Sequence, residues 1–134
     1  MIAEPRIPEP RFLEPEEVLE LHDALLETHG GLVGLRDRGG LMSAVQSPRN
    51  QWYYSGGDLV DLASVLLLHL IRNHPFNDGN KRAALASALV FLDAHGISLR
   101  DDPERLEWLT LEAAQGRLDV EPLAAALREL FSED

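Results

Sequence analysis

The sequence contains no cysteine among its 134 residues. A disulfide framework is therefore excluded, and so is a metal site built on thiolates. Cations are scarce as well: 12 Lys and Arg against 23 Asp and Glu leave a formal net charge of −11. Nucleic acids and anionic lipids are bound largely through Lys and Arg, so this balance argues against both as main partners. Because the missing cysteines fit a reducing cytosol, we expect a cytoplasmic protein.

Long apolar runs are also missing. Between Leu62 and Leu70 the uninterrupted run Val65–Leu68 is short, whereas a helix that spans a bilayer needs about 20 apolar residues. Neither a Walker A loop nor a Gly-x-Gly-x-x-Gly run is present, so the common nucleotide-binding folds are not indicated. With 45% apolar and 26% charged residues, the composition is that of one globular domain.

The chain divides into a proline-rich arm and a helical domain. Residues 1–13 contain Pro5, Pro8 and Pro10 and few apolar side chains, so we expect an extended arm that either lacks fixed structure or packs on a neighbour. Residues 14–132 carry helical periodicity, caps and breakers. These patterns predict helices over about 15–29, 40–46, 58–72, 81–94, 103–115 and 122–131. The fold class is therefore all-α: a compact bundle of about six helices, in which 58–72 is apolar almost all round and central.

The segment 47–57 is expected to be an irregular flap before the central helix. It combines residues that break helices with three neighbouring aromatics: Pro48, Gly56, Gly57, Trp52, Tyr53 and Tyr54. The prolines and glycines favour a loop. The aromatic side chains either belong to the core or dock a target protein.

One polar stretch lies between the two most apolar predicted helices, and we interpret it as a site for phosphate chemistry. It runs from His74 to Arg82 and leads into a helix N-terminus, where backbone N–H groups lack partners and favour anions. Lys81 and Arg82 add full positive charges. Asp78 is placed to hold Mg²⁺ beside a phosphate, and the imidazole of His74 can take a proton from a hydroxyl.

Each of these residues also has an ordinary explanation. Asp78 alone would be read as a helix N-cap, His74 as a turn residue, and Lys81 and Arg82 as solvated side chains. The conjunction of all the required groups within nine residues favours the functional interpretation. The remaining histidines lack such neighbours and are interpreted as packing or surface residues: His22, His29, His69 and His95.

The stretch resembles the signature of the Fic superfamily, His-x-Phe-x-Asp/Glu-Gly-Asn-Gly-Arg-x-x-Arg. Six positions match: His74, Phe76, Asp78, Gly79, Asn80 and Arg82. Lys81 replaces the glycine after the asparagine, which is typical of the death-on-curing (Doc) toxins of that superfamily, and Leu85 replaces the last arginine. Similarity to the family extends over roughly residues 11–131, including Gly30-Gly31, Gly34 and Leu85–Gly96.

The resemblance implies an all-α Fic fold with ATP and Mg²⁺ at the motif. His74 would be the general base, and Phe76 would anchor the loop in the core. Asp78 would hold Mg²⁺, and Gly79 and Asn80 would form an anion hole. The triphosphate would be bound by Lys81 and Arg82.

The resemblance further implies a toxin of a toxin–antitoxin system. Doc-type members transfer the terminal phosphate of ATP to a hydroxyl of elongation factor Tu and so stop translation. No inhibitory Ser/Thr-x-x-x-Glu-Gly/Asn pattern is present in this chain, so restraint would come from an antitoxin whose C-terminal segment occupies an apolar groove near the site. Two alternatives remain open: an AMP transferase of the Fic type, and a catalytically silent module that binds the antitoxin as a corepressor.

Overall fold

A computed structural model describes residues 6–130 of the chain, and within them it contains helices and turns but no strand. The helices are α1 (Pro15–His29), α2 (Arg38–Tyr54), α3 (Leu59–Asn73), α4 (Asn80–Ala94), α5 (Pro103–Ala114) and α6 (Val120–Arg128). The all-α prediction is therefore confirmed. Residues 1–5 of the predicted arm, and Phe131 of the predicted last helix, lie outside the described residues.

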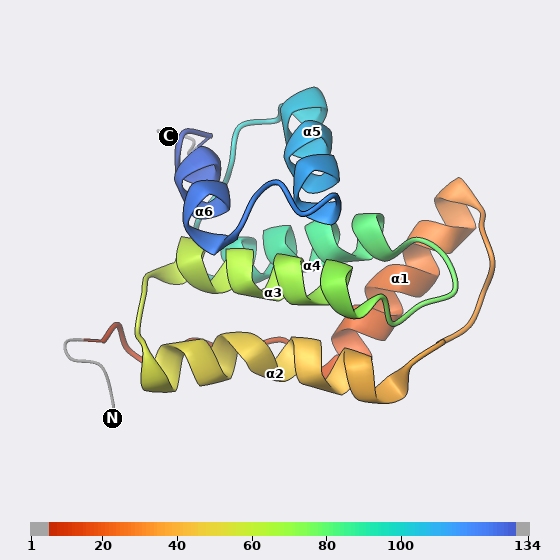
Figure 1. Ribbon diagram of the computed structural model, residues 1–134, viewed down its shortest axis with the longest axis horizontal. Coiled ribbons are helices and arrows are strands. Elements are labelled where there is room, and N and C mark those ends of the chain that lie inside the picture. Colours follow the sequence, from red (N-terminus) through yellow and green to blue (C-terminus); the bar gives the residue numbers. More distant parts are fainter. Residues whose placement is uncertain (1–5, 131–134) are drawn as a thin grey trace.

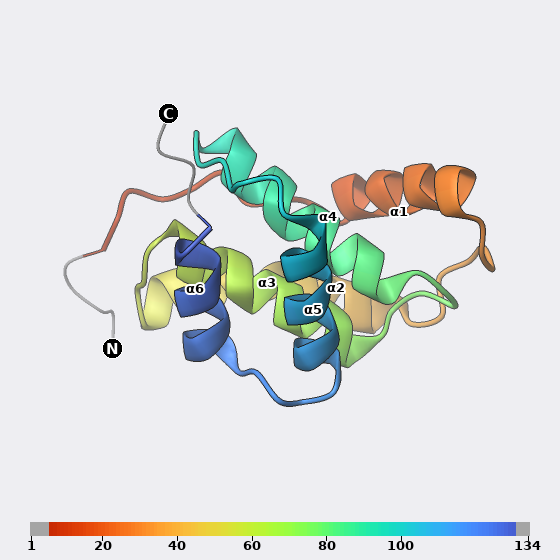
Figure 2. The ribbon, with the colours of Figure 1, turned by 90° about the horizontal axis from the view of Figure 1, so that it is seen from above.

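Helix α3 is the centre of the fold, as its apolar sequence predicted. Ten of its 15 residues are buried, because α2, α4, α5 and α6 all pack against it. Figure 1 shows α2 on one side of α3 and the pair α5 and α6 on the opposite side. Seen from above in Figure 2, α1 lies at one end of the molecule, where it packs against α4. Among these helices of the described chain, none has the length and apolarity needed to cross a membrane.

The predicted flap at 47–57 is wrong, because α2 continues as a helix through Tyr54. Proline inside a helix leaves the carbonyl four residues earlier without its N–H partner. Here that carbonyl belongs to Ala44, and the hydroxyl of Ser47 donates a hydrogen bond to it at 2.6 Å. Burial of Pro48 and its neighbours against α3 supplies the rest of the stabilisation. The loop-forming tendency of proline is overridden by tertiary packing and by one substitute hydrogen bond.

The N-terminal arm is extended over residues 6–13 and packs on the domain. Phe12 and Leu13 are 4% and 2% exposed and belong to the hydrophobic core. The indole N–H of Trp52 donates a hydrogen bond to the carbonyl oxygen of Ile7 at 2.8 Å, and the ring of Phe12 stacks on Phe91. Trp52 therefore holds the arm, whereas Tyr53 and Tyr54 beside it are exposed.

Helix α6 is attached to the start of α3 by an ionic cluster. Asp58 caps α3 by accepting the backbone N–H of Asp61, and the guanidinium of Arg128 donates hydrogen bonds to the carboxylates of both Asp58 and Asp61. Partial burial by itself would raise the pKa of Asp58, but the bonds from Arg128 and from the Asp61 backbone outweigh it and hold that pKa below its usual value of 3.8.

Ser47→Ala is expected to lower the free energy of unfolding by about 1 kcal/mol, because the Ala44 carbonyl loses its hydroxyl donor. The cost should nearly vanish in a Pro48→Ala background, where the new N–H of residue 48 bonds the same carbonyl. Urea denaturation of the four proteins in this cycle measures the coupling. An equal cost in both backgrounds would contradict this account of α2.

Arg128→Gln is expected to lower the free energy of unfolding by about 0.5–1 kcal/mol at neutral pH, the range for a partly exposed ion pair. Because the folded-state pKa of Asp58 is depressed, the stabilisation exists above the unfolded pKa and is lost as pH falls through the folded one. The difference between wild type and variant should therefore disappear in strong acid. Denaturation at neutral pH and in strong acid checks this, with Arg117→Gln as the control, because Arg117 is a more exposed arginine whose ion pair with Glu112 lies elsewhere in the chain. A difference that persists in acid would assign the effect to packing instead.

Candidate active site

The candidate site is built on the turn between α3 and α4. Helix α3 ends at Asn73, and the residue that caps it, His74, adopts the left-handed conformation with φ 49° and ψ 57°. His74 is the one non-glycine residue with positive φ in the described part of the chain. Its imidazole is exposed and makes no hydrogen bond within residues 6–130. The side chain is therefore available to exchange a proton.

Phe76 anchors the middle of the turn in the core. Its side chain is 1% exposed, and its ring stacks on the imidazole of His22 with 3.7 Å between centroids. The amide of Asn80 then closes the turn: its oxygen accepts the Phe76 N–H and its nitrogen donates to the Phe76 carbonyl, both at 2.9 Å. Because the Asn80 side chain is 7% exposed and both of its polar atoms bond the Phe76 backbone, we assign the backbone N–H of residue 80 to the predicted anion hole.

The loop that joins α1 to α2, residues 30–37, lies along this turn. Leu35 pairs with Phe76 in an isolated antiparallel bridge, and the carbonyl oxygen of Gly34 accepts the N–H of Asn77 at 3.1 Å. A Cβ on Gly34 would come within 2.6 Å of the Asn77 side chain, and its φ of 114° excludes most other residues. Residues 30–37, not 47–57, are therefore the irregular segment that borders the motif.

Asp78 is held from three directions. Its carboxylate accepts the backbone N–H groups of Leu32 and Gly79, at 3.2 and 2.9 Å. Its carbonyl oxygen lies 2.7 Å from Nε2 of His22, which must carry the proton because a carbonyl only accepts. The bonds from Leu32 and Gly79, helped by the nearby charges of Arg82 and Lys81, hold the pKa of Asp78 below its usual 3.8. The carboxylate is therefore ionised at neutral pH.

The N-terminus of α4 is left open toward solvent. Its N-cap is Gly79 in the left-handed conformation, and no side chain caps the helix. Asp78, the residue that ordinary capping would use, points its carboxylate at Leu32 and Gly79 instead. The first-turn N–H groups thus remain free to bind an anion, with the exposed side chains of Lys81 and Arg82 beside them. Lys81 is the single lysine of the sequence.

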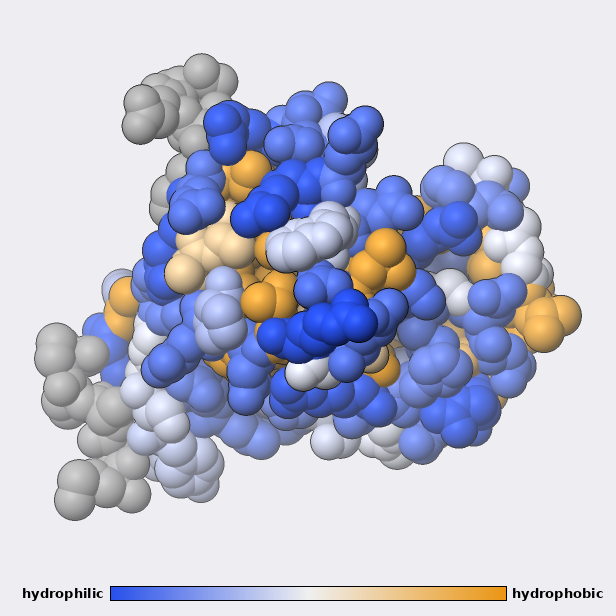
Figure 3. All heavy atoms as spheres, turned by 45° about the horizontal axis from the view of Figure 1, so that its top comes forward, coloured by the Kyte–Doolittle hydropathy of each residue, from blue (hydrophilic) through white to orange (hydrophobic). Residues whose placement is uncertain are grey.

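A cavity of about 660 Å³ opens at this helix end. One wall carries the polar motif residues Asp78–Arg82, together with His29 from α1. The rest of the lining comes mostly from α4 and α5 and includes the leucines Leu85, Leu89, Leu106 and Leu111, with Asp101, Glu107 and Thr110 among them. Figure 3 shows such apolar side chains in the hollows of an otherwise hydrophilic face. The cavity thus offers charge at one end and apolar surface along its length.

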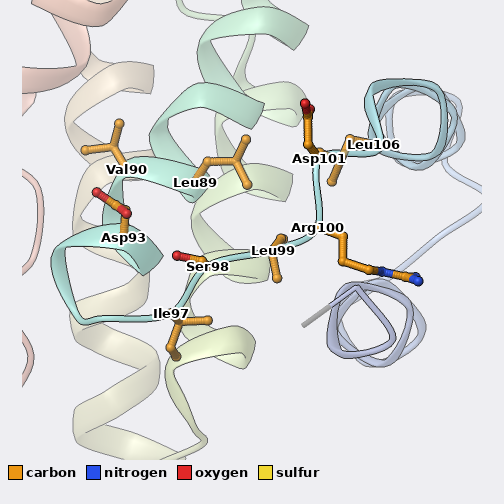
Figure 4. Close-up of a pocket in the computed structure, with 9 residues that line it drawn as sticks. All are labelled: Leu89, Val90, Asp93, Ile97, Ser98, Leu99, Arg100, Asp101 and Leu106. Atoms are coloured by element: carbon orange, nitrogen blue, oxygen red, sulfur yellow. The ribbon is translucent and has the colours of Figure 1, made fainter. Parts of the chain in front are cut away.

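A second hollow of about 390 Å³ continues from the first along α4 and shares Leu89, Asp101 and Leu106 with it. Figure 4 shows its two sides, the outer face of α4 and the segment 97–101 that returns toward α5. Arg100 points away from this hollow, toward α6, where its guanidinium donates to the Glu129 carbonyl. The two hollows together form a groove that ends at the motif and that carries apolar side chains along its length, with acidic residues such as Asp93, Asp101 and Glu107 between them.

The site residues suit a magnesium ion that arrives with a nucleotide. Within residues 6–130 no cluster of three or more His, Asp or Glu side chains could hold a metal by itself. Asp78 supplies one ionised, exposed carboxylate whose oxygens each retain a lone pair. Mg²⁺ is commonly bound in this way, through one or two carboxylates, water and substrate phosphates.

The structure brings most of the predicted site residues together and separates others from them. Asp78, Gly79, Asn80, Lys81 and Arg82 line one cavity, and His74 lies on the same turn without lining it. Trp52, Tyr53 and Tyr54 lie at the end of α2, which Figures 1 and 2 show on the opposite end of the molecule from the α3–α4 turn. They line a separate cavity with Arg6 and Arg49.

Two residues that contact the motif were missed from sequence. His22 was interpreted as a packing residue, and it packs, but it also bonds the Asp78 carbonyl. Arg36 was counted only among the positions similar to the family and was given no role at the site, although its guanidinium donates to the carbonyl oxygen of His74. No sequence signal could have assigned either contact, since both partners are backbone carbonyls at least 38 positions away.

Comparison with known proteins agrees with this geometry. The model of the Fic/DOC family matches residues 12–92. The protein named "Protein kinase doc" from Escherichia phage P1 is 38% identical over 122 residues, which are 90% of this chain and 96% of the phage protein. "Toxin Doc" from Mycolicibacterium smegmatis is also 38% identical, over 87% of this chain and 90% of its own length. The chain belongs to the Fic/DOC family.

Proposed function

We propose that the chain is the toxin of a toxin–antitoxin pair and acts as a phosphotransferase. It would move the terminal phosphate of ATP to a hydroxyl side chain of a translation factor, with elongation factor Tu as the expected target. The names of the two relatives support the toxin and kinase assignments. The observation that carries the proposal is the open N-terminus of α4, which lies with Asp78, Lys81 and Arg82 on the wall of one cavity.

The phosphates of ATP would bind where the helix lacks a cap. The N–H groups of the first turn of α4 are donors of fixed direction, and the helix dipole adds positive potential. Lys81 and Arg82 neutralise the remaining charge. A bound Mg²⁺ would add charge neutralisation through Asp78, which its two backbone bonds keep ionised and oriented.

His74 would act as the general base. It accepts the proton of the target hydroxyl as that oxygen forms a bond to the terminal phosphorus of ATP, and the bond from this phosphorus to the bridging oxygen breaks to release ADP. An exposed imidazole suits this role. Its exposed place on the turn, outside the residues that line the cavity, leaves room for a protein substrate to approach.

The antitoxin would cover the apolar groove. Leu85, Leu89, Leu106 and Leu111 form an apolar wall beside the phosphate site, and Leu111 is 38% exposed. A short segment that folds into such a groove buries apolar surface and closes the cavity at the same time. We propose this groove as the seat of the C-terminal segment of an antitoxin.

The transferred group can be identified with ATP that is labelled either at the α-phosphate or at the γ-phosphate. Incubation of the protein with Mg²⁺ and purified elongation factor Tu is expected to transfer γ-label but no α-label. His74→Ala should lower the rate at least 100-fold, about the value of a general base. The matched control is His69→Gln, a half-buried histidine on α3 outside the cavity.

Two other outcomes would replace the proposal. Transfer of α-label would assign the chain as an AMP transferase. No transfer of either label, with ATP binding intact, would favour a module that only binds its antitoxin. In bacteria without an antitoxin, the kinase assignment requires growth arrest by the wild type and not by His74→Ala.

Lys81→Gly is expected to shift the transferred group from phosphate toward AMP. The glycine removes a charge and opens space at the second residue of α4, so the triphosphate can lie in another direction and present a different phosphorus to the hydroxyl. The doubly labelled assay above measures the ratio of the two products. Lys81→Arg, which keeps the charge and the bulk, serves as the control. An unchanged product ratio in the glycine variant would refute this role of Lys81.

A further inference from the structure

Arg36 binds three consecutive carbonyl groups at the end of α3. Its guanidinium donates to the carbonyl oxygen of His74 through Nε, at 2.9 Å, and to that of Asn73 through Nη2, at 3.3 Å. Its own backbone N–H donates to the carbonyl oxygen of Pro75 at 2.7 Å. A planar guanidinium can span two adjacent acceptors in this way, which an ammonium cannot.

The residue held at the centre of these contacts is in an unfavourable conformation. His74 has positive φ, which costs free energy for any residue with a Cβ. Pro75 follows it, and a residue before proline is restricted toward extended conformations. Such conformations persist only where surrounding contacts impose them. On the carbonyl side of His74, the side-chain contacts come from Arg36. The backbone N–H groups of Arg36 and Asp37 both donate to the Pro75 carbonyl oxygen.

The rest of the motif is held by other residues. The Asn80 amide bonds the Phe76 backbone, His22 bonds the Asp78 carbonyl, and Leu32 bonds the Asp78 carboxylate. These contacts position the phosphate half of the site without Arg36. The direction of the His74 imidazole and the phosphate site therefore have separate supports.

We propose that Arg36 is a positioning residue that sets the direction of the catalytic His74. This proposal rests on the general-base role of His74 in the proposed function. Arg36 acts on the transfer step through the backbone of His74, and it makes no contribution to nucleotide binding. Because the side chain is exposed, it can be changed without opening the core.

The test compares Arg36→Gln with Arg38→Gln. Arg38 is an exposed arginine two residues away, and its side chain makes no interaction within the described residues. We expect Arg36→Gln to lower kcat for γ-label transfer about 10- to 100-fold, the effect of a displaced catalytic group. Arg38→Gln should change kcat less than twofold. Arg36→Lys keeps the positive charge but lacks the planar guanidinium that spans two carbonyl groups, and it should give an intermediate rate.

Nucleotide binding is read independently of activity through Lys81. As the single lysine of the sequence, Lys81 gives one internal site of acylation by an amine-reactive reagent, and ATP should protect it. The ATP concentration that gives half protection is expected to be the same, within twofold, in wild type and in Arg36→Gln. If Arg36→Gln lost both its protection by ATP and its kcat, the proposal would be overturned. A kcat of Arg36→Gln equal to that of the Arg38→Gln control would also overturn it, and so would full activity of Arg36→Lys.

Failure of the proposed function would be seen in the wild type, which would then transfer no label. The positioning claim is still testable in that case by NMR. The Cα and Cβ chemical shifts of His74 report its backbone conformation, and they should move away from left-handed values in Arg36→Gln and not in Arg38→Gln. Unchanged shifts in Arg36→Gln would overturn the role of Arg36 whatever reaction the protein catalyses.

Discussion

The site depends on the pair of hydrogen bonds between the Asn80 amide and the backbone of Phe76. These bonds close the turn between α3 and α4, two helices that bury apolar faces against each other. With the turn closed, Phe76 lies in the core and His22 stacks against it. Because this turn is fixed from inside the protein, its polar residues on the outside remain available for a ligand.

The start of α4 differs from the other helix starts in one respect. Helices α2, α3, α5 and α6 begin with Asp37, Asp58, Asp102 and Asp119, and each of these carboxylates accepts a backbone N–H of its helix. Helix α4 begins with Gly79 and has no side-chain cap. Helix α1 begins with Glu14, so five of the six helices have an acidic residue at the N-cap and α4 has none. An anion such as phosphate would complete the missing cap.

Strain and open donors at the site are offset by burial elsewhere. His74 in the left-handed region and the uncapped α4 both cost free energy. The packing of α3, with ten of its 15 residues buried, supplies stability that does not depend on the motif. A site that is destabilised in its free state gains most from binding a ligand, because ligand contacts then replace contacts the protein lacks.

Most of the fold followed from local sequence patterns. Asp58 and Asp102 mark helix starts, and Gly30 marks a helix end, since caps and breakers act through the chain within a few residues. Pro48 led to the wrong prediction of a flap for the same reason. Its effect on the chain is local, but the compensation by Ser47 and by burial against α3 depends on tertiary packing. The aromatic residues Trp52–Tyr54 were assigned to a flap on the strength of that local reading.

The sequence by itself determined the helical composition, the central place of α3 and the set of residues at the motif, because each is a property of neighbouring positions. Only the tertiary structure decided which of these residues face the cavity and what holds them there. The side chain of Asn80 turns inward, and His22 and Arg36 reach the motif from other elements. Their partners are backbone carbonyls, which every residue carries, so no pattern of side chains along the sequence can predict these contacts.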